Sequence, residues 1–250
     1  MRDTDVPVKT RSENLTASPE ILSLANGRDI PVRIRHSRRA RRILLHVGVY
    51  DGKVEIVLPP GASAREGLGF AATQTSWVAD QLSRIGDAVP FADGAVFPLL
   101  GHTVTIRRTD SRSALPFLSE NELVVGGRDD TVPTRVRRWL RTRALQEISP
   151  RANAMGEKLG RKPARISMRD TRSRWGSCSR EGNLNFSWRL VMAPENVLDY
   201  VVAHEAAHLR ELNHSDRFWA LVDTLCPDVG QARGWLRANG AELHRYGRES

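Results

Sequence analysis

The residues with the clearest chemical potential are His204, Glu205 and His208, which form the pattern His-Glu-x-x-His. In an α-helix, residues four apart lie on one face about one turn apart, so both imidazoles can reach a single metal ion. A carboxylate next to the first histidine can accept a proton from a metal-bound water without itself being a ligand. The spacing therefore predicts a metal site with a glutamate general base.

A third ligand is required, because catalytic zinc is usually held by three protein side chains and leaves one position for water. His214 can supply it if the helix, expected over about residues 195–212, ends and the chain folds back. Asn213 stands where this reversal is required, and asparagine tolerates left-handed backbone angles. Ser215 has the character of a helix N-cap, so the next helix would start directly after the ligand. We therefore expect one Zn²⁺ ion held by the two helix histidines and His214.

Chance is a weak explanation for this motif. With seven histidines in the chain, a random His-Glu-x-x-His is expected on the order of 0.01 times. A buried helix whose histidines only pack or form hydrogen bonds would be a costly way to fill a core. The spacing of the three histidines also matches the metzincin signature, but Glu211 stands where that signature has glycine and no methionine follows Met192. The sequence thus argues against a metzincin.

The elements that must position these residues lie in the C-terminal half. Pro133 opens a long helical stretch, which Pro150 is expected to kink or split. Strands are predicted at residues 166–168 and 184–188. The segment 175–178 between them is expected to be turn material, since it contains glycine and serine.

The N-terminal half is predicted to be rich in β-structure. Residues 1–26 mix polar residues and proline without apolar periodicity, which indicates a flexible leader. Short β runs follow, and Asp51-Gly52 predicts the turn of a hairpin. A single helix is predicted over about residues 64–86, and further strands over 96–106.

The charge balance is basic: 38 lysines and arginines oppose 29 acidic residues, and the formal net charge is +9. Only four of these cations are lysines, and arginines crowd the helical stretch over residues 135–143. A polyanionic partner such as a nucleotide or a nucleic acid would explain the excess. Arginine accumulated through coding bias on a solvated helix face is the explanation that composition favours, but both interpretations stay open.

Composition excludes several classes of protein. The chain of 250 residues is 40% hydrophobic and 27% charged, as in globular domains. No apolar run approaches the ~18 residues of a membrane span, and the N-terminus lacks a signal-peptide core. Two cysteines, Cys178 and Cys226, suit a reducing compartment. We expect a cytoplasmic protein that has no membrane partner.

Four blocks of the C-terminal region are specific enough to indicate a family. They read WGSCS, LNFSWRLVMAP, LDYVVAHE and NHSDRFW within residues 172–238. On these blocks the chain resembles the YgjP-like metallopeptidase family, relatives of the SprT-like and WLM zinc peptidases. The resemblance continues more weakly upstream, through the arginine-rich strands over about 33–60 and Trp77. One departure is Ala206, where a larger apolar residue is expected.

The resemblance implies an α+β fold, in which a small β-rich N-terminal region precedes a mostly helical, zincin-like metallopeptidase domain. With the predicted elements, the expected domains are a leader over 1–26, a β-rich region with one helix over 27–130 and a catalytic domain over 131–250. The implied activity is zinc-dependent hydrolysis of a protein or peptide substrate. The implied metal ligands are His204, His208 and His214. The implied general base is Glu205.

Peptide hydrolysis also needs an oxyanion-stabilising group and a surface that orients the substrate. The segment Leu184–Trp188 is expected to be an edge strand to which an extended substrate adds. Cys178 is expected to be a small buried thiol rather than a fourth metal ligand. The candidates for stabilising the oxyanion are Arg172, Arg174, Tyr200 and Tyr246.

Two other functions remain open at this point. The same metal and water chemistry can attack phosphoanhydrides, which would make the chain a nucleotide pyrophosphatase. The second alternative function is that of a nucleic-acid-associated adaptor with a structural zinc. The basic stretch over 135–143 is the part of the sequence that favours it. Imidazole ligands also suit other first-row metals. The sequence does not indicate the oligomeric state.

Overall fold

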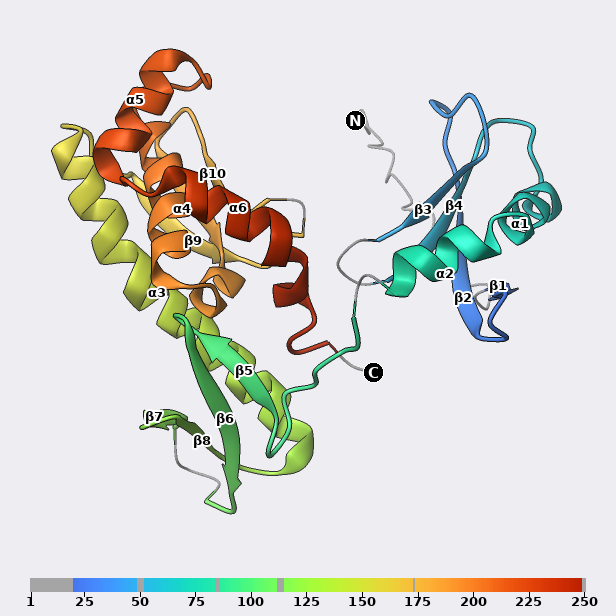
Figure 1. Cartoon of the computed structure of the whole chain (residues 1–250), viewed down its shortest axis with the longest axis horizontal. Helices are drawn as coiled ribbons and strands as arrows, with labels where there is room; N and C mark the ends of the chain where they lie inside the picture. The colour runs from blue at the N-terminus through green and yellow to red at the C-terminus, as the bar shows by residue number, and fades with distance from the viewer. Residues whose placement is uncertain (1–19, 49–51, 84–85, 112–114, 173, 249–250) are drawn as a thin grey trace, which may run out of the picture. The chain divides into compact units, whose positions relative to one another are not determined.

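The computed structural model describes residues 20–48, 52–83, 86–111, 115–172 and 174–248 (Figure 1). The chain divides into two compact units, one formed by residues 1–48 with 53–81 and the other essentially by residues 82–250. A β-rich N-terminal region precedes a mostly helical C-terminal region, so the predicted α+β class is confirmed.

The first unit is a four-stranded sheet with two helices. Strand order is β1-β2-β4-β3, with β2 and β4 parallel and the two outer pairs antiparallel. Helix α1 packs on the sheet because glycine at position 67 lets the helix backbone approach the side chains of Ile56 and Leu58. The elements are β1 (Glu20–Ser23), β2 (Asp29–His36), β3 (Leu44–Val47), β4 (Val54–Leu58), α1 (Ala64–Ala72) and α2 (Thr75–Ser83).

Two predictions for this unit were wrong. The leader was expected to reach residue 26, but residues 20–23 form β1, because Leu22 is buried and the strand pairs with β2. The single helix over 64–86 is two helices. The first ends at Ala72 and is capped by Thr73, whose hydroxyl donates to the Phe70 carbonyl at 2.7 Å. Residues 1–19 and Asp51 of the predicted hairpin turn lie outside the described residues.

A second four-stranded sheet opens the second unit. Its order is β5-β6-β8-β7, with a parallel β6–β8 pair at the centre. Figure 1 shows these green strands against the N-terminal half of the long helix α3. The elements are β5 (Val96–Leu99), β6 (His102–Thr109), β7 (Phe117–Ser119), β8 (Glu122–Gly126) and α3 (Val132–Lys158).

Helix α3 is the longest element, and it runs through Pro150 without a break. Pro150 was expected to kink or split this helix, and it does not split it. Proline deprives the carbonyl four residues earlier of its partner. Here that carbonyl belongs to Gln146, which is exposed like Pro150 itself, so water can satisfy it. The opposite face carries an apolar stripe, which includes the fully buried Val136, Leu140 and Ile148.

A three-stranded sheet and three further helices complete the second unit. Strand β11 is central, antiparallel to β10 and parallel to β9. The segment predicted as turn material at 175–178 therefore contains a strand instead, because it pairs with β11. The elements are β9 (Arg165–Arg169), β10 (Gly176–Cys178), β11 (Asn183–Ser187), α4 (Glu195–Ala207), α5 (Asp216–Leu225) and α6 (Val229–Asn239).

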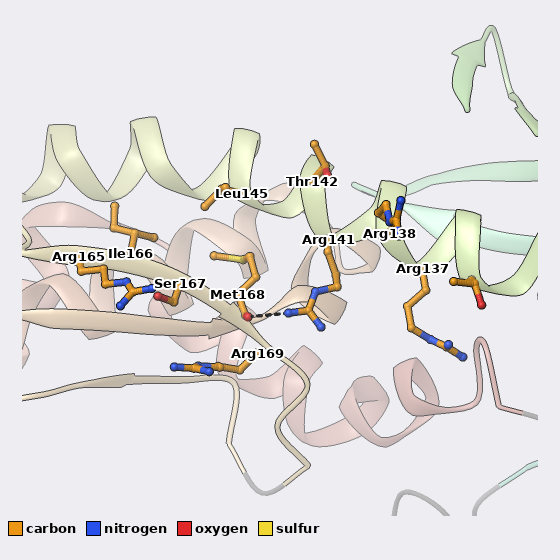
Figure 2. Close-up of a pocket in the computed structure, with 11 residues that line it drawn as sticks. Arg137, Arg138, Arg141, Thr142, Leu145, Arg165, Ile166, Ser167, Met168 and Arg169 are labelled. Atoms are coloured by element: carbon orange, nitrogen blue, oxygen red, sulfur yellow. Dashed lines mark hydrogen bonds between the residues drawn. The ribbon is translucent and has the colours of Figure 1, made fainter. Parts of the chain in front are cut away.

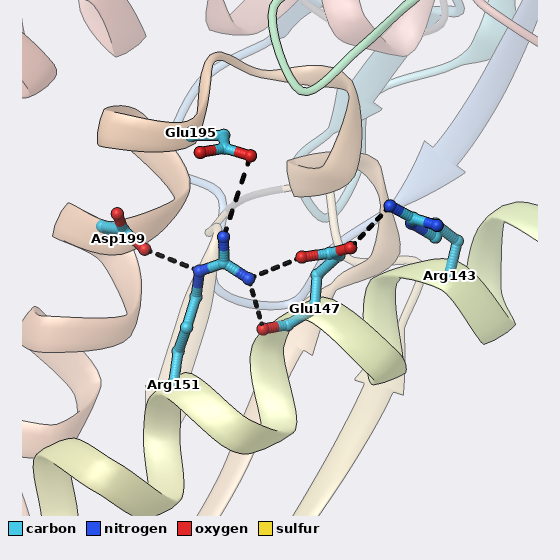
Figure 3. A network of polar contacts seen from close by, with 5 residues as sticks. All are labelled: Arg143, Glu147, Arg151, Glu195 and Asp199. Carbon is cyan, nitrogen blue, oxygen red and sulfur yellow. Dashed lines mark hydrogen bonds and ion pairs between the residues drawn. The ribbon is translucent and has the colours of Figure 1, made fainter. Parts of the chain in front are cut away.

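Ion pairs tie α3 to α4 (Figure 3). The guanidinium of Arg151 lies 2.8 Å from an Asp199 carboxylate oxygen and 3.9 Å from Glu195, both on α4. The same guanidinium contacts Glu147 at 2.5 Å, and Arg143 holds the second oxygen of Glu147 at 2.7 Å. Positive charge on this face of α3 is thus matched by carboxylates. The network fixes the N-terminal half of α4 on α3.

The two compact units divide at residues 81–82, whereas the expected boundary between the β-rich region and the catalytic domain was 130–131. The difference arises because Phe97, Ile106 and Leu123 of the second sheet share one continuous apolar core with Val136 and Leu140 of α3. Within the described part of the chain, no helix combines the length and apolarity that crossing a membrane requires.

This shared core predicts how fragments of the chain fold. A fragment of residues 86–250 should unfold in one cooperative thermal transition. A fragment of residues 131–250 should not, because it exposes the α3 face that the second sheet covers. Removing one large core side chain costs about 2–5 kcal/mol, and removing several exceeds the roughly 5–15 kcal/mol of a typical domain. Calorimetry checks this, and a cooperative transition in the shorter fragment would instead support a boundary at 130–131.

Candidate metal centre

The histidine motif lies at the C-terminal end of α4. His204 and Glu205 are in its last turn, and the helix ends at Ala207 with His208 as the C-cap. The helix is therefore shorter than the predicted 195–212. The following chain turns back, and Ser215 caps α5 through its side chain, as predicted. Consecutive elements thus hold the motif and the third histidine.

The reversal before His214 differs from the expectation. Asn213 is not among the described residues with a left-handed backbone. Its carbonyl instead accepts a hydrogen bond from the Ser215 amide at 2.8 Å. A short turn closed by this bond returns the chain, so the left-handed conformation is not needed.

The three histidines converge. The ring centroid of His204 lies 5.0 Å from the ring centroid of His208 and 5.0 Å from that of His214. The ring centroids of His208 and His214 are 4.8 Å apart. The Nε2 atoms of His204 and His214 are 3.1 Å apart. One nitrogen from each ring lies within 4.8 Å of the others, and this is the group of described residues that could hold a metal ion.

The chemistry of these donors fits a zinc ion. Two nitrogens bound to a tetrahedral zinc at about 2.0–2.1 Å stand about 3.3 Å apart, close to the 3.1 Å between the Nε2 atoms of His204 and His214. The Nδ1 of His208 lies 2.9 Å from the Glu211 carbonyl, which can only accept, so Nδ1 holds the proton and Nε2 keeps its lone pair. Burial lowers the pKa of His204 to about 4 and also lowers the pKa of His208. Both rings are therefore neutral near pH 7, as metal binding requires.

An aromatic wall holds the rings in place. Phe218 of α5 is fully buried, and its ring centroid lies 4.9, 4.5 and 4.8 Å from those of His204, His208 and His214 respectively. Trp219 stacks on His214 at 6.0 Å with an interplanar angle of 27°. Both aromatics therefore pack against the histidine cluster. Their rings limit the rotation of all three imidazoles.

Glu205 is buried beside the backbone of β10. Its side chain is only 6% exposed, and burial raises its pKa to about 8 against the opposing effect of Arg174. A Cβ atom on Gly176 would lie 2.5 Å from the Glu205 Cγ and 2.6 Å from its Oε1. Only glycine permits this approach. The role of Gly176 was not predicted from the sequence, although the WGSCS block contains this glycine.

Cys178, the last residue of β10, is a half-buried thiol. Its Sγ donates to the Ser179 carbonyl at 3.3 Å, and burial raises its pKa to about 11. The sulfur is therefore protonated near neutral pH, whereas metal ligation requires the thiolate. This supports the expectation of a structural thiol.

The structure separates the oxyanion candidates. Tyr200, one turn before His204 on α4, has its ring 6.0 Å from that imidazole, and the Arg174 charge acts on Glu205. Tyr246 lies elsewhere, since it bridges Val89, and Arg172 is an electrostatic neighbour of Arg189. Tyr200 therefore lies beside a metal-ligand candidate, and Arg174 is close enough to affect the general-base candidate.

Sequence reasoning missed Arg233. Its guanidinium lies 4.9 Å above the ring of Trp219, the residue that stacks on His214. Its charge also acts on Tyr200 and His204. The residue comes from α6, and no local pattern in the sequence links it to the histidine motif.

The strand expected to bind substrate was wrongly chosen. Leu184–Trp188 was expected at an edge, but β11 lies between β10 and β9 and is paired on both sides. Strand β10 is the edge strand next to Glu205. Chain order alone suggested β11, and the non-local pairing with β9 overturns that choice.

The family model of the YgjP-like metallopeptidase domain matches residues 41–239. The chain belongs to the YgjP-like metallopeptidase family. A search of curated proteins gave no match. Among solved structures, the metallopeptidase zymogen of Pyrococcus abyssi abylysin is 20% identical over 40% of this chain and 97% of its own, with a TM-score of 0.34. The predicted family is confirmed. In this YgjP-like domain, Ala206, the departure noted above, is fully buried.

The approach between Gly176 and Glu205 predicts a sensitive position. Gly176→Ala should lower the free energy of unfolding by about 1–3 kcal/mol, because the new Cβ forces Glu205 or β10 to shift. Gly230→Ala on α6 is the matched control, since its Cβ would meet no atom within 4 Å. Urea denaturation of both variants is the measurement. Equal stabilities would show that the contact around Glu205 is not tight.

Proposed function

We propose that this YgjP-like protein is a zinc-dependent metallopeptidase. In this proposal His204, His208 and His214 hold a single Zn²⁺ ion, and Glu205 is the general base. Family membership supports a metal-dependent hydrolase that acts on proteins or peptides. The observation that carries the proposal is the convergence of three imidazoles beside a buried carboxyl group.

The site residues divide the chemistry among them. A divalent ion held by the imidazoles lowers the pKa of a water molecule and polarises a substrate carbonyl. Glu205 accepts a proton from the attacking water and later delivers it to the leaving amine nitrogen as the peptide C–N bond breaks. Burial favours this exchange, because it raises the pKa of the Glu205 carboxyl group to about 8. A pKa close to neutral pH lets the group both accept and release a proton.

Strand β10 is the surface that we expect to orient the substrate. An extended peptide can pair with an exposed strand edge through main-chain hydrogen bonds. Edge strand β10 passes directly against Glu205 at Gly176, so a peptide paired there would run past the general base. Tyr200 and Arg233 lie on the His204 side and are the groups that we expect to stabilise developing negative charge.

Metal analysis tests the ligand set. His208→Ala should lose the bound zinc, about one ion per chain in the wild type, because two imidazoles underfill the site. His102→Ala is the control, because this histidine is exposed on β6. Inductively coupled plasma mass spectrometry of both purified variants gives the zinc content. Full zinc content in His208→Ala would remove this histidine from the ligand set.

Hydrolysis assays test the base and the substrate class. Glu205→Gln should retain zinc but cleave casein about 10²–10⁴-fold more slowly, since it removes the proton acceptor. Glu157→Gln, an exposed change on α3, should cleave at the wild-type rate. Nucleoside triphosphates are assayed in parallel. If only phosphate release depended on Glu205, the protein would be a pyrophosphatase. Zinc binding with no hydrolysis of either would indicate a structural metal.

A further inference from the structure

A hollow lies between α3 and β9, lined by none of the residues of the metal centre (Figure 2). Its volume is about 600 Å³, and α3 and β9 line it from opposite sides. We call it the arginine groove, because five guanidinium groups line it. These belong to Arg137, Arg138 and Arg141 of α3 and to Arg165 and Arg169 of β9.

The charge in the arginine groove is uncompensated. Among the described residues, none of the five arginines pairs with a carboxylate. Arg137 donates to the Gly247 carbonyl at 3.0 Å, Arg141 to the Met168 carbonyl at 3.1 Å and Arg169 to the Asn185 side-chain oxygen at 3.3 Å. Those three acceptors are neutral. Clustered like charges without counter-charges destabilise a fold, so a bound anion would relieve a cost that the protein otherwise bears.

The other face of α3 provides the contrast. Arg143 and Arg151 belong to the same helix, yet Arg143 pairs with the Glu147 carboxylate and Arg151 with the carboxylates of Glu147, Glu195 and Asp199 (Figure 3). Coding bias alone would not place the arginines with carboxylate partners on one face of α3 and those without such partners on another. The distribution indicates that the arginines toward α4 serve packing, whereas those toward β9 are left for a ligand.

The hollow is elongated. Its α3 wall extends from Thr134 to Leu145, which is about 16 Å at the rise of an α-helix. Thr134 and Arg138 also line a neighbouring hollow of about 480 Å³ at the start of α3, together with Arg128. A single phosphate or carboxylate would fill only a small part of this length. The ligand that fits is a chain of repeated negative charges.

The lining favours phosphates over an acidic peptide. Arginines and the hydroxyls of Thr134, Thr142 and Ser167 are the usual donors to phosphate oxygens. A peptide would be expected to add to the strand edge, but Arg141 already occupies the Met168 carbonyl on β9. No aromatic side chain lines the hollow, so it offers contacts to a backbone and no platform for stacking bases.

We propose that the arginine groove binds the phosphate backbone of a single-stranded nucleic acid, without preference for its sequence. Arginines on both walls can contact one strand from two sides. The metal centre is a separate site, because β11 lies between β9 and β10, which puts the two edges about 10 Å apart. The inference does not depend on the peptidase proposal, since binding needs neither zinc nor Glu205.

Fluorescence anisotropy with a labelled oligodeoxythymidylate of about 20 nucleotides tests the inference, since that length exceeds the ~4–16 nucleotides of common single-strand sites. The full chain should bind the probe with an affinity that falls steeply with salt. Arg138→Gln combined with Arg165→Gln should weaken binding about tenfold at low salt and reduce the salt slope by about 1.4, at ~0.7 for each phosphate that is no longer neutralised. Neither arginine side chain makes a hydrogen bond or ion pair to another described residue, so the fold should be kept.

The matched control is Arg38→Gln combined with Arg237→Gln, which removes the same charge from exposed positions outside the groove. Its affinity and salt slope should stay within about twofold of wild type. Equal losses of affinity in the two double variants would overturn the proposal, because net charge alone would then explain binding.

Competition identifies the ligand. Polyglutamate and tripolyphosphate should displace the probe only at concentrations well above those of unlabelled oligonucleotide. Stronger binding of polyglutamate would assign the groove to an acidic protein segment, and equal binding of tripolyphosphate would assign it to a short polyphosphate. Either result would overturn the proposal. Thermal unfolding of each variant and its zinc content are measured alongside, so that a loss of binding is not confused with a loss of fold.

Discussion

The packing of Phe218 against three imidazoles is the interaction on which the metal centre depends. Its ring contacts His204 and His208 at the end of α4 and His214 beyond the reversal. Phe218 lies in the first turn of α5, where the cap at Ser215 fixes the backbone. Phe218 of α5 therefore helps to fix the positions of the histidines at the end of α4 and in the loop that follows it. Ligands held by packing need little reorganisation when a metal binds, which is the advantage of a preorganised site.

Burial has opposite effects on the two kinds of titratable group at this centre. It lowers the pKa of His204 and His208, which keeps the imidazoles neutral, and it raises the pKa of Glu205. A dry environment produced by β10, α4 and α5 therefore favours both a set of neutral ligands and a carboxyl group that exchanges protons readily. Gly176 is part of the same arrangement, because its missing side chain lets β10 cover the carboxyl group.

Helix α3 organises the rest of the second unit. One face supplies the apolar core shared with the second sheet, another holds α4 through Arg151, and a third lines the arginine groove. The same residue type has different roles on these faces, because neighbouring elements decide whether a carboxylate is within reach. A basic composition alone favoured a solvated face over nucleic-acid binding. The positions of the surrounding acids favour nucleic-acid binding for the β9 side.

The sequence by itself determined the family, the α+β class, the grouping of the histidines and the cap at Ser215, because these depend on residues a few positions apart. Helical spacing brings His204 and His208 together in any helix that contains them. Only the tertiary structure decided which strand forms the edge, where the compact units divide and which arginines lack counter-charges. Strand order depends on the pairing of β11 with β9, and the approach of Arg233 depends on the packing of α6. Such contacts join residues far apart in the chain, and no local pattern encodes them.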